Sequence, residues 1–216
     1  MIHVLIADDH AIIRDGLQAL LQLQPDMRVV AMAANGREAI QQALRHCPDV
    51  AILDIGMPQL NGIDAARQIL QQCDDTKIII LTMHTTVEHV LRALRAGVHG
   101  YLMKESAGAE LLQAIRAVHA GQRYLCEHVS ELVKKHEADA PGAADFVSPL
   151  DSLSHREREV LQLVVEGHTS AEIADRLFLA PSTVETYRSR LMGKLGIDDL
   201  PGLVKFALRH GLITLE

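Results

Sequence analysis

The chain has few cysteines, no long apolar segment and no excess of basic residues. Only Cys47, Cys73 and Cys126 occur among 216 residues, too few and too scattered for a disulfide framework or a zinc site, so each is interpreted as filler in or near a core. No stretch approaches the ~18 uninterrupted apolar residues of a membrane-spanning helix. Residues 1–4 lack the basic start and apolar core of a signal peptide. A cytoplasmic protein with no membrane partner is therefore expected.

The composition is that of a globular protein, with 48% hydrophobic and 23% charged residues and a net charge of −7. The charge is spread evenly, with a net of −3 over residues 1–120, −2 over 121–150 and −2 over 151–216. No segment is basic as a whole. A nucleic-acid surface, if there is one, must therefore be local.

Residues 1–120 alternate short apolar runs with longer amphipathic segments of helical spacing, a pattern typical of a parallel sheet covered by helices on both faces. The sequence therefore predicts an α/β, doubly wound domain with a five-stranded parallel sheet over 1–120. The expected strands lie at 2–7, 27–33, 50–53, 77–81 and 101–103, and the expected helices near 11–23, 36–46, 62–72, 86–97 and 107–120.

The rest of the chain lacks this rhythm. Residues 121–149 are interpreted as a partly helical linker, with a helix or helical extension over 127–137 and an Ala-, Pro-, Gly- and acid-rich stretch over 138–149. Residues 150–216 predict a small all-α domain of four helices, near 155–166, 169–177, 182–196 and 200–210. Three of these begin with a capping-box pattern, formed by Ser154 and Glu157, Thr169 and Glu172, and Ser182 and Glu185.

Polar side chains follow four of the expected strands. Asp8 and Asp9 follow the first strand, Asp54 the third, Thr82 the fourth and Lys104 the fifth. Because the carboxyl ends of parallel strands share one edge, where doubly wound folds bind their ligands, we expect these side chains to converge.

Three carboxylates in one small pocket repel one another unless a cation is present, and Mg²⁺ prefers such oxygen ligands. Lys104 adds a fixed positive charge, Thr82 a hydroxyl donor, and Asp54 a carboxylate able to form an acyl phosphate. One alternative is a phosphatase-like enzyme that turns Asp54 over. Such enzymes usually have a second acid two residues further on, but position 56 is Gly.

The expected helices at 169–177 and 182–196, joined by residues 178–181, form a helix-turn-helix whose second helix is the recognition helix. Val184, Tyr187, Leu191 and Leu195 share the predicted core face. The opposite face is small and polar, which allows close approach to a major groove, and consists of Ser182, Thr186, Ser189 and Gly193, flanked by Glu185 and Arg190.

Charge on this helix is locally positive, since Arg188, Arg190 and Lys194 stand against Glu185 alone. Such a stripe suits phosphate contact. Arg190 has the chemistry to donate to guanine or to phosphate. Glu185 has the chemistry to accept from a cytosine amine, but an exposed capping-box glutamate needs no DNA, so both interpretations stay open.

Residues 1–120 resemble the receiver domain of two-component response regulators, which have a flavodoxin-like fold. This resemblance implies that Asp54 accepts a phosphoryl group from a sensor histidine kinase, and that Thr82 and Tyr101 form a switch. It also implies that Asp9, Asp54 and the Gly56 carbonyl bind Mg²⁺ directly and that Asp8 acts through water. The matching stretches are 6–10, 53–58, 61–62, 81–84 and 100–104.

Residues 150–213 resemble the LuxR-type helix-turn-helix, which together with the receiver gives the NarL/FixJ-type architecture. The matching stretches are 153–161, 172–174, 182–184 and 194–196. The resemblance implies that Thr183 and Lys194 contact phosphate and that Glu185, Thr186 and Ser189 face the bases. Ala180 departs from the family, in which Ser or Thr is frequent at that position.

These observations predict a phosphorylation-activated, DNA-binding transcription regulator rather than an enzyme. Phosphorylation would free the recognition helix, promote homodimerisation, or both, and a dimer would read two operator half-sites about one helical turn apart on double-stranded DNA. Two further alternatives are a constitutive DNA-binding protein with an unphosphorylated receiver and a small-molecule sensor that has the same DNA-reading domain.

Overall fold

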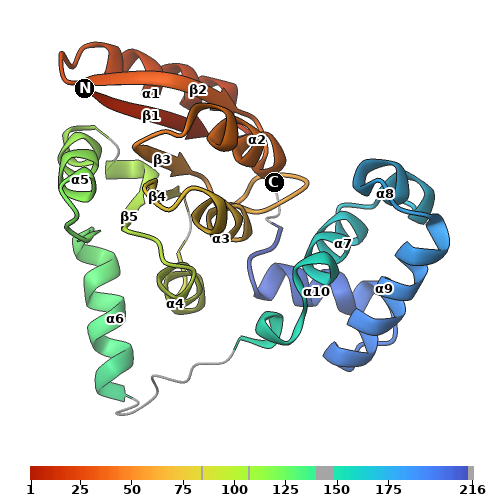
Figure 1. Ribbon diagram of the computed structural model, residues 1–216. Helices are drawn as coiled ribbons and strands as arrows, with labels where there is room; N and C mark the ends of the chain where they lie inside the picture. The colour runs from red at the N-terminus through yellow and green to blue at the C-terminus, as the bar shows by residue number, and fades with distance from the viewer. Residues whose placement is uncertain (84, 107, 140–147, 214–216) are drawn as a thin grey trace. The chain divides into compact units, whose positions relative to one another are not determined.

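The computed structural model describes residues 1–83, 85–106, 108–139 and 148–213. The chain divides into two compact units, Met1–Asp145 and Phe146–Glu216, each with its own hydrophobic core (Figure 1). Among the described residues, no helix is both long and apolar enough to cross a bilayer.

Within the described part of the first unit, six parallel strands form one sheet in the order β2-β1-β3-β4-β5-β6. The prediction of a parallel, doubly wound sheet is confirmed, but the number of strands was wrong. The sixth strand has two residues and was interpreted as part of the linker, because so short a segment carries no periodic pattern. The strands are β1 (Ile2–Ala7), β2 (Met27–Ala33), β3 (Val50–Leu53), β4 (Lys77–Thr82), β5 (Gly100–Met103) and β6 (Tyr124–Leu125).

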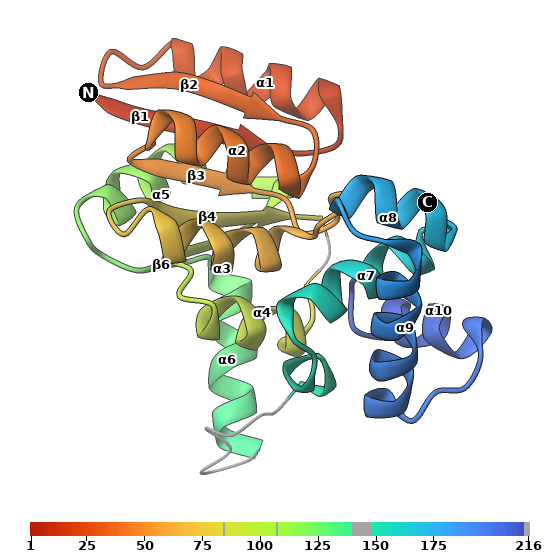
Figure 2. The ribbon, with the colours of Figure 1, turned by 45° about the vertical axis from the view of Figure 1, so that its right-hand side comes forward.

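Side chains alternate between the two faces of the sheet, and each face is covered by helices (Figure 2). Val4, Ile6 and Ile52 pack in the core with helices α1 and α5, whereas Leu5 and Leu53 pack in a second core with α2, α3 and α4. Helix α6, which begins directly after β6, packs beside α4. The helices are α1 (Ala11–Gln22), α2 (Gly36–His46), α3 (Gly62–Gln72), α4 (Val87–Arg95), α5 (Ala109–His119) and α6 (Glu127–Asp139).

The strand register places the ends of β1 and β3 side by side. Ala7 pairs with Leu53, and the Asp54 N–H donates to the Ala7 carbonyl at 2.9 Å. The turn after β3 then passes so close to this strand end that only glycine fits at position 62, where a Cβ would lie 2.0 Å from the Asp54 carbonyl oxygen. Helix α3 starts at this glycine, with the Asn61 side chain accepting from the Asp64 N–H at 2.9 Å.

Over its described residues 148–213, the second unit consists of a short 3-10 turn, η3 (Pro149–Ser152), and four helices around one apolar core. The capping boxes predicted at Ser154 and Thr169 are present. The one predicted at Ser182 was wrong, because the fixed backbone of Pro181 starts the helix one residue earlier and leaves Ala180 as the cap. The helices are α7 (His155–Val165), α8 (Ser170–Leu177), α9 (Pro181–Leu195) and α10 (Leu200–Arg209).

Gly62→Ala is expected to lower the free energy of unfolding of the first unit by about 2–4 kcal/mol, since the new methyl group must displace backbone next to Asp54. Urea denaturation followed by circular dichroism measures the change. Gly16→Ala is the matched control, because nothing lies within 4 Å of a Cβ there and alanine favours the helix interior by about 0.5–1 kcal/mol. Equal stabilities for the two variants would contradict the close approach.

Candidate functional site

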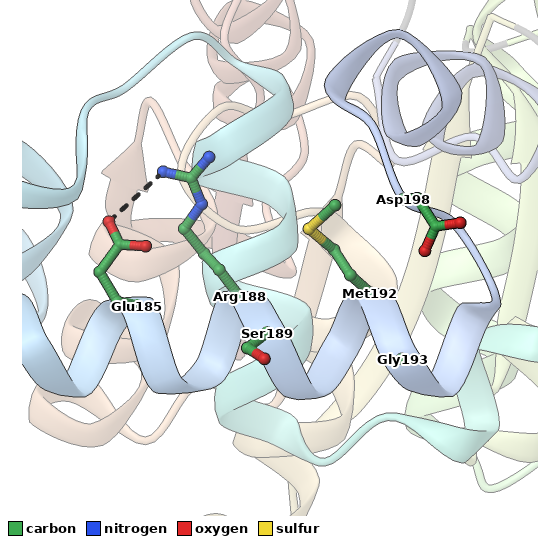
Figure 3. Close-up of a pocket in the computed structure, with 6 residues that line it drawn as sticks. All are labelled: Glu185, Arg188, Ser189, Met192, Gly193 and Asp198. Carbon is green, nitrogen blue, oxygen red and sulfur yellow. Dashed lines mark ion pairs between the residues drawn. The ribbon is translucent and has the colours of Figure 1, made fainter.

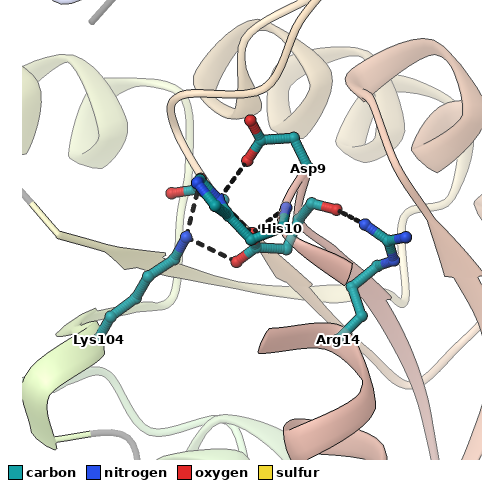
Figure 4. Close-up of polar contacts among 6 residues, drawn as sticks. Asp9, His10, Arg14 and Lys104 are labelled. Atoms are coloured by element: carbon teal, nitrogen blue, oxygen red, sulfur yellow. Dashed lines mark hydrogen bonds and ion pairs between the residues drawn. The ribbon is translucent and has the colours of Figure 1, made fainter. Parts of the chain in front are cut away.

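Four of the predicted side chains, those of Asp8, Asp9, Asp54 and Lys104, converge at the carboxyl edge of the sheet; Asp9 and Lys104 are labelled in Figure 4. The Lys104 Nζ lies 2.7 Å from Asp8 Oδ2 and 3.0 Å from Asp54 Oδ2, and all three side chains are less than one-tenth exposed. Asp9, one quarter exposed, stands on the solvent side of this group. These residues come from three different strand ends, so the sheet topology alone brings them together.

Two residues that the sequence analysis did not select also contact the acid pair. The ring Nδ1 of His10 lies 2.7 Å from Asp9 Oδ1 and 3.2 Å from Asp8 Oδ1, and the His10 N–H donates to Asp8 Oδ1 at 2.9 Å. Arg14, one turn into α1, donates to the backbone carbonyl of Asp8 at 2.5 Å. The position of His10 directly after the two acids could have indicated this contact from the sequence. His10 is also the N-cap residue of α1, although its side chain makes no capping hydrogen bond.

The negative charges in this pocket outnumber the positive charge of Lys104. Burial raises the pKa of the Asp54 carboxyl, Lys104 partly opposes that rise, and the charges of Asp8 and Asp9 add to it. For Lys104, burial lowers the pKa, but the charge of Asp54 and hydrogen bonds to Asp8 and Asp54 outweigh it, so the pKa lies above its ordinary value. One ammonium thus neutralises three carboxylates incompletely.

The donor set fits a hard divalent cation. Ligand atoms of Asp8, Asp9, His10 and Asp54 all lie within 4.8 Å of one another, and carboxylate oxygens are the ligands that Mg²⁺ prefers. Gly56 lies half-buried in the bend two residues after Asp54, so its backbone follows the acid into the same loop. A bound cation would relieve the desolvation and repulsion that raise the pKa of Asp54.

The two predicted switch residues lie on β4 and β5 beside this cluster. Thr82 is buried at the end of β4, paired in register with Met103. Tyr101 is fully buried, and its hydroxyl accepts from Thr85 Oγ1 at 2.7 Å. Burial raises the pKa of Tyr101 above its ordinary value, with the Thr85 hydrogen bond opposing the rise. The phenol is therefore neutral and held inward.

The predicted recognition helix is α9. Val184 and Leu191 are fully buried on its inner face, as expected from their spacing. The residues predicted to meet DNA are exposed or half-buried, namely Ser182, Thr183, Glu185, Thr186, Arg188, Ser189, Arg190 and Lys194. Two hollows of about 490 and 340 Å³ lie along the exposed side of the helix.

The larger hollow contains a small polar network (Figure 3). Glu185 and Arg188 project from the same side of α9 and pair at 3.8 Å. Ser170, the first residue of α8, donates to Glu185 and accepts from Arg188 at 2.9 Å. Sequence reasoning missed Ser170, since nothing in the spacing shows that the start of α8 lies against the middle of α9.

The predicted phosphate contact Lys194 is engaged within its own unit. Its Nζ lies 2.6 Å from Glu157 Oε2, the carboxylate that also closes the capping box of α7. Burial raises the pKa of Glu157, but hydrogen bonds from Lys194 and Ser154 bring it below its ordinary value. Lys194 itself stays 42% exposed, so its ammonium is accessible to an anion.

Comparison with known proteins agrees with both halves of this geometry. Residues 4–116 match the response regulator receiver domain family, and residues 151–207 match the LuxR family of bacterial regulatory proteins. The chain is 39% identical to the oxygen regulatory protein NreC of Staphylococcus epidermidis, over 97% of this chain and 98% of that protein. The chain belongs to the LuxR-type response regulators.

Solved structures of this family are similar to the regulator. One is a LuxR-family response regulator from Aurantimonas sp., 35% identical with a TM-score of 0.61 over 64% of this chain and 99% of the other. Another is the response regulator RcsB in complex with DNA, 28% identical with a TM-score of 0.61 over 97% and 98%. The regulator is thus a phosphorylation-regulated, DNA-binding transcription regulator, not a classical enzyme.

Asp54→Asn is expected to raise the free energy of unfolding in EDTA at pH 7–8 by about 1 kcal/mol or more, roughly 2–4 °C in melting temperature. The ionised form of Asp54 is disfavoured by folding, so wild-type stability falls as pH rises from the unfolded pKa to the higher folded pKa. Thermal melts over a pH series measure this. The advantage should vanish below the unfolded pKa of about 3.9, and a constant advantage at every pH would contradict it.

Proposed function

We propose that Asp54 is the residue that receives the phosphoryl group. The observation that carries this proposal is the contact of Lys104 with both Asp8 and Asp54 at 2.7 and 3.0 Å in a buried pocket. An Asp54 oxygen would attack phosphorus as the bond to the donor breaks, and the Lys104 ammonium would turn to the incoming phosphoryl oxygens. The donor proposed is a phosphorylated histidine of a sensor kinase.

Asp9 and Asp54 would hold Mg²⁺ directly, with the Gly56 carbonyl, and Asp8 would act through water. When bound, Mg²⁺ neutralises charge on the transferring group. The partial exposure of Asp9 supports an entry path from solvent. The His10 ring would turn away from Asp9, since a hard cation prefers oxygen ligands.

Thr82 and Tyr101 would transmit the phosphorylation state. A phosphoryl group brings acceptor oxygens and negative charge to Asp54, and the Thr82 hydroxyl at the neighbouring strand end is a suitable donor. A state in which Thr82 and Lys104 engage those oxygens would gain population over the unphosphorylated ensemble. Tyr101 is buried with its hydroxyl accepting from Thr85, and the burial of its side chain would change when Asp54 is phosphorylated.

The recognition helix would enter the major groove of double-stranded operator DNA. Contacts to phosphates and guanine would come from Thr183, Arg188, Arg190 and Lys194. The small polar side chains of Ser182, Thr186 and Ser189 would let the helix approach the bases closely. Glu185 would be held by Ser170 and Arg188 in a position to accept from cytosine. We propose that an activated homodimer reads two half-sites in the cytoplasm.

Phosphorylation is tested with acetyl phosphate as the donor. In Mg²⁺, intact-mass spectrometry should show one added phosphoryl group on the wild type, and none in EDTA or on Asp54→Asn. Asp15→Asn is the matched control, because Asp15 is an exposed acid on α1 outside the cluster, and it should be phosphorylated like the wild type. A phosphoryl group retained by Asp54→Asn would overturn the assignment.

The link to DNA is tested by selecting bound duplexes from a random pool with the phosphorylated regulator. The selected duplex should bind the phosphorylated wild type at least tenfold more tightly than the unphosphorylated protein or Asp54→Asn. Equal affinities of the phosphorylated and unphosphorylated proteins for this duplex would contradict control by phosphorylation and favour a constitutive DNA-binding protein.

Lys194→Gln is expected to weaken binding to non-specific duplex DNA roughly three- to tenfold and to reduce the slope of log K against log salt by about one, because one phosphate contact is lost. Fluorescence anisotropy over a series of salt concentrations measures both. Lys205→Gln, with the same charge change at an exposed position of α10, should keep the wild-type slope. An unchanged salt slope for Lys194→Gln would contradict the predicted contact between Lys194 and a DNA phosphate.

A further inference from the structure

Two cysteines lie at the ends of neighbouring helices, away from the acid cluster. Cys47 ends α2 with a left-handed backbone at φ 42°, and Cys73 ends α3. Helices α2 and α3 pack against each other on the same face of the sheet. Because both helices run back from the carboxyl edge, their last residues lie at the edge opposite to Asp54.

The two cysteines share a hydrogen-bond acceptor. The Cys47 N–H donates to the Ala43 carbonyl at 2.8 Å, and the Cys73 thiol lies 3.8 Å from the same oxygen. The segments that follow the helices are also joined, since the buried Thr76 hydroxyl donates to the Pro48 carbonyl at 2.8 Å. The Cys73 thiol therefore lies beside the backbone of Cys47, whose own thiol lies 3.9 Å from the Leu44 carbonyl oxygen.

The thiols also interact with each other. Burial is the largest influence that raises the pKa of the Cys73 thiol, and the charge of Cys47 and a hydrogen bond with it raise that pKa further. Cys47 is exposed and Cys73 is half-buried, whereas Cys126 is buried. Cys47 is thus accessible to an oxidant in solution, and Cys73 is placed to resolve an oxidised Cys47.

We propose that Cys47 and Cys73 form a reversible disulfide in response to a peroxide. The Cys47 thiolate attacks one oxygen of hydrogen peroxide, which breaks the O–O bond and gives a sulfenic acid and hydroxide. The Cys73 thiolate then attacks the Cys47 sulfur, which forms the S–S bond and releases the sulfenic oxygen as water. In total, two thiols and one peroxide give one disulfide and two waters, and a low-molecular-weight dithiol reverses the reaction.

The disulfide would link the C-terminal ends of α2 and α3 and close a loop of about 27 residues that contains β3 and Asp54. Closing such a loop restricts the unfolded chain, so the first unit should become more resistant to unfolding. Its melting temperature should rise by about 5–10 °C. This inference does not depend on the phosphorylation of Asp54.

The test uses the reduced full-length regulator with hydrogen peroxide at pH 8. Free thiols counted in denaturant should fall from three to one per chain. Trypsin should leave peptides 46–67 and 68–77 joined, and they should separate on reduction. Thermal melts should show the rise in melting temperature for the oxidised protein and its loss after dithiothreitol.

Variants separate this pair from the third cysteine. Cys47→Ser and Cys73→Ser should neither lose two thiols nor gain stability on oxidation, whereas Cys126→Ala should behave as the wild type does. Oxidation of the unfolded wild type in guanidinium should give mixed pairings that include Cys126, as a check that folding selects the pair. Three thiols remaining after peroxide, oxidation without a Cys47–Cys73 link, or disulfides only between chains would overturn the proposal.

Discussion

The arrangement of the acid cluster depends on a single buried ammonium. Lys104 bridges Asp8 and Asp54 at the edge of a parallel sheet, with Asp9 adjacent to them. Buried carboxylates at this spacing repel one another, and one lysine neutralises them only in part. A cation or a phosphoryl group bound in this pocket therefore changes the interactions among these charges more than it would at the surface, where water screens them. The repulsion among these carboxylates destabilises the first unit, and it also makes the pocket responsive to a bound cation or phosphoryl group.

The second unit uses a related device at its surface. Lys194 and Arg188 lie on the helix that would meet DNA, and within the unit they contact Glu157 and Ser170. These partners hold long, flexible side chains in defined positions before DNA arrives, which reduces the conformational entropy lost on binding. The price is that phosphate must compete with Glu157 for the Lys194 ammonium. A net charge of −7 for the whole chain is compatible with DNA binding because α9 carries three basic residues and only one acidic residue, Glu185.

Much of this could be predicted from local patterns. The alternation of apolar runs and amphipathic segments predicted the doubly wound sheet, and hydroxyl–glutamate pairs correctly marked the starts of α7 and α8. The pattern failed at Ser182, where Pro181 sets the helix start, and at Tyr124–Leu125, a strand too short to show alternation. Ser170 could not be selected, because its partners on α9 depend on how the two helices pack. His10 was overlooked, although its partners Asp8 and Asp9 directly precede it in the sequence.

The sequence by itself determined which residues carry charge, where helices and strands form, and that acids and a lysine follow strand ends, because these properties depend on residue type and near neighbours. Only the tertiary structure decided which charges touch, since the distances from Lys104 to Asp8 and Asp54 follow from the order and register of strands far apart in the chain. It also decided that Cys47 and Cys73, each interpreted from sequence as a core filler, lie beside each other, because the packing of α2 on α3 sets that contact.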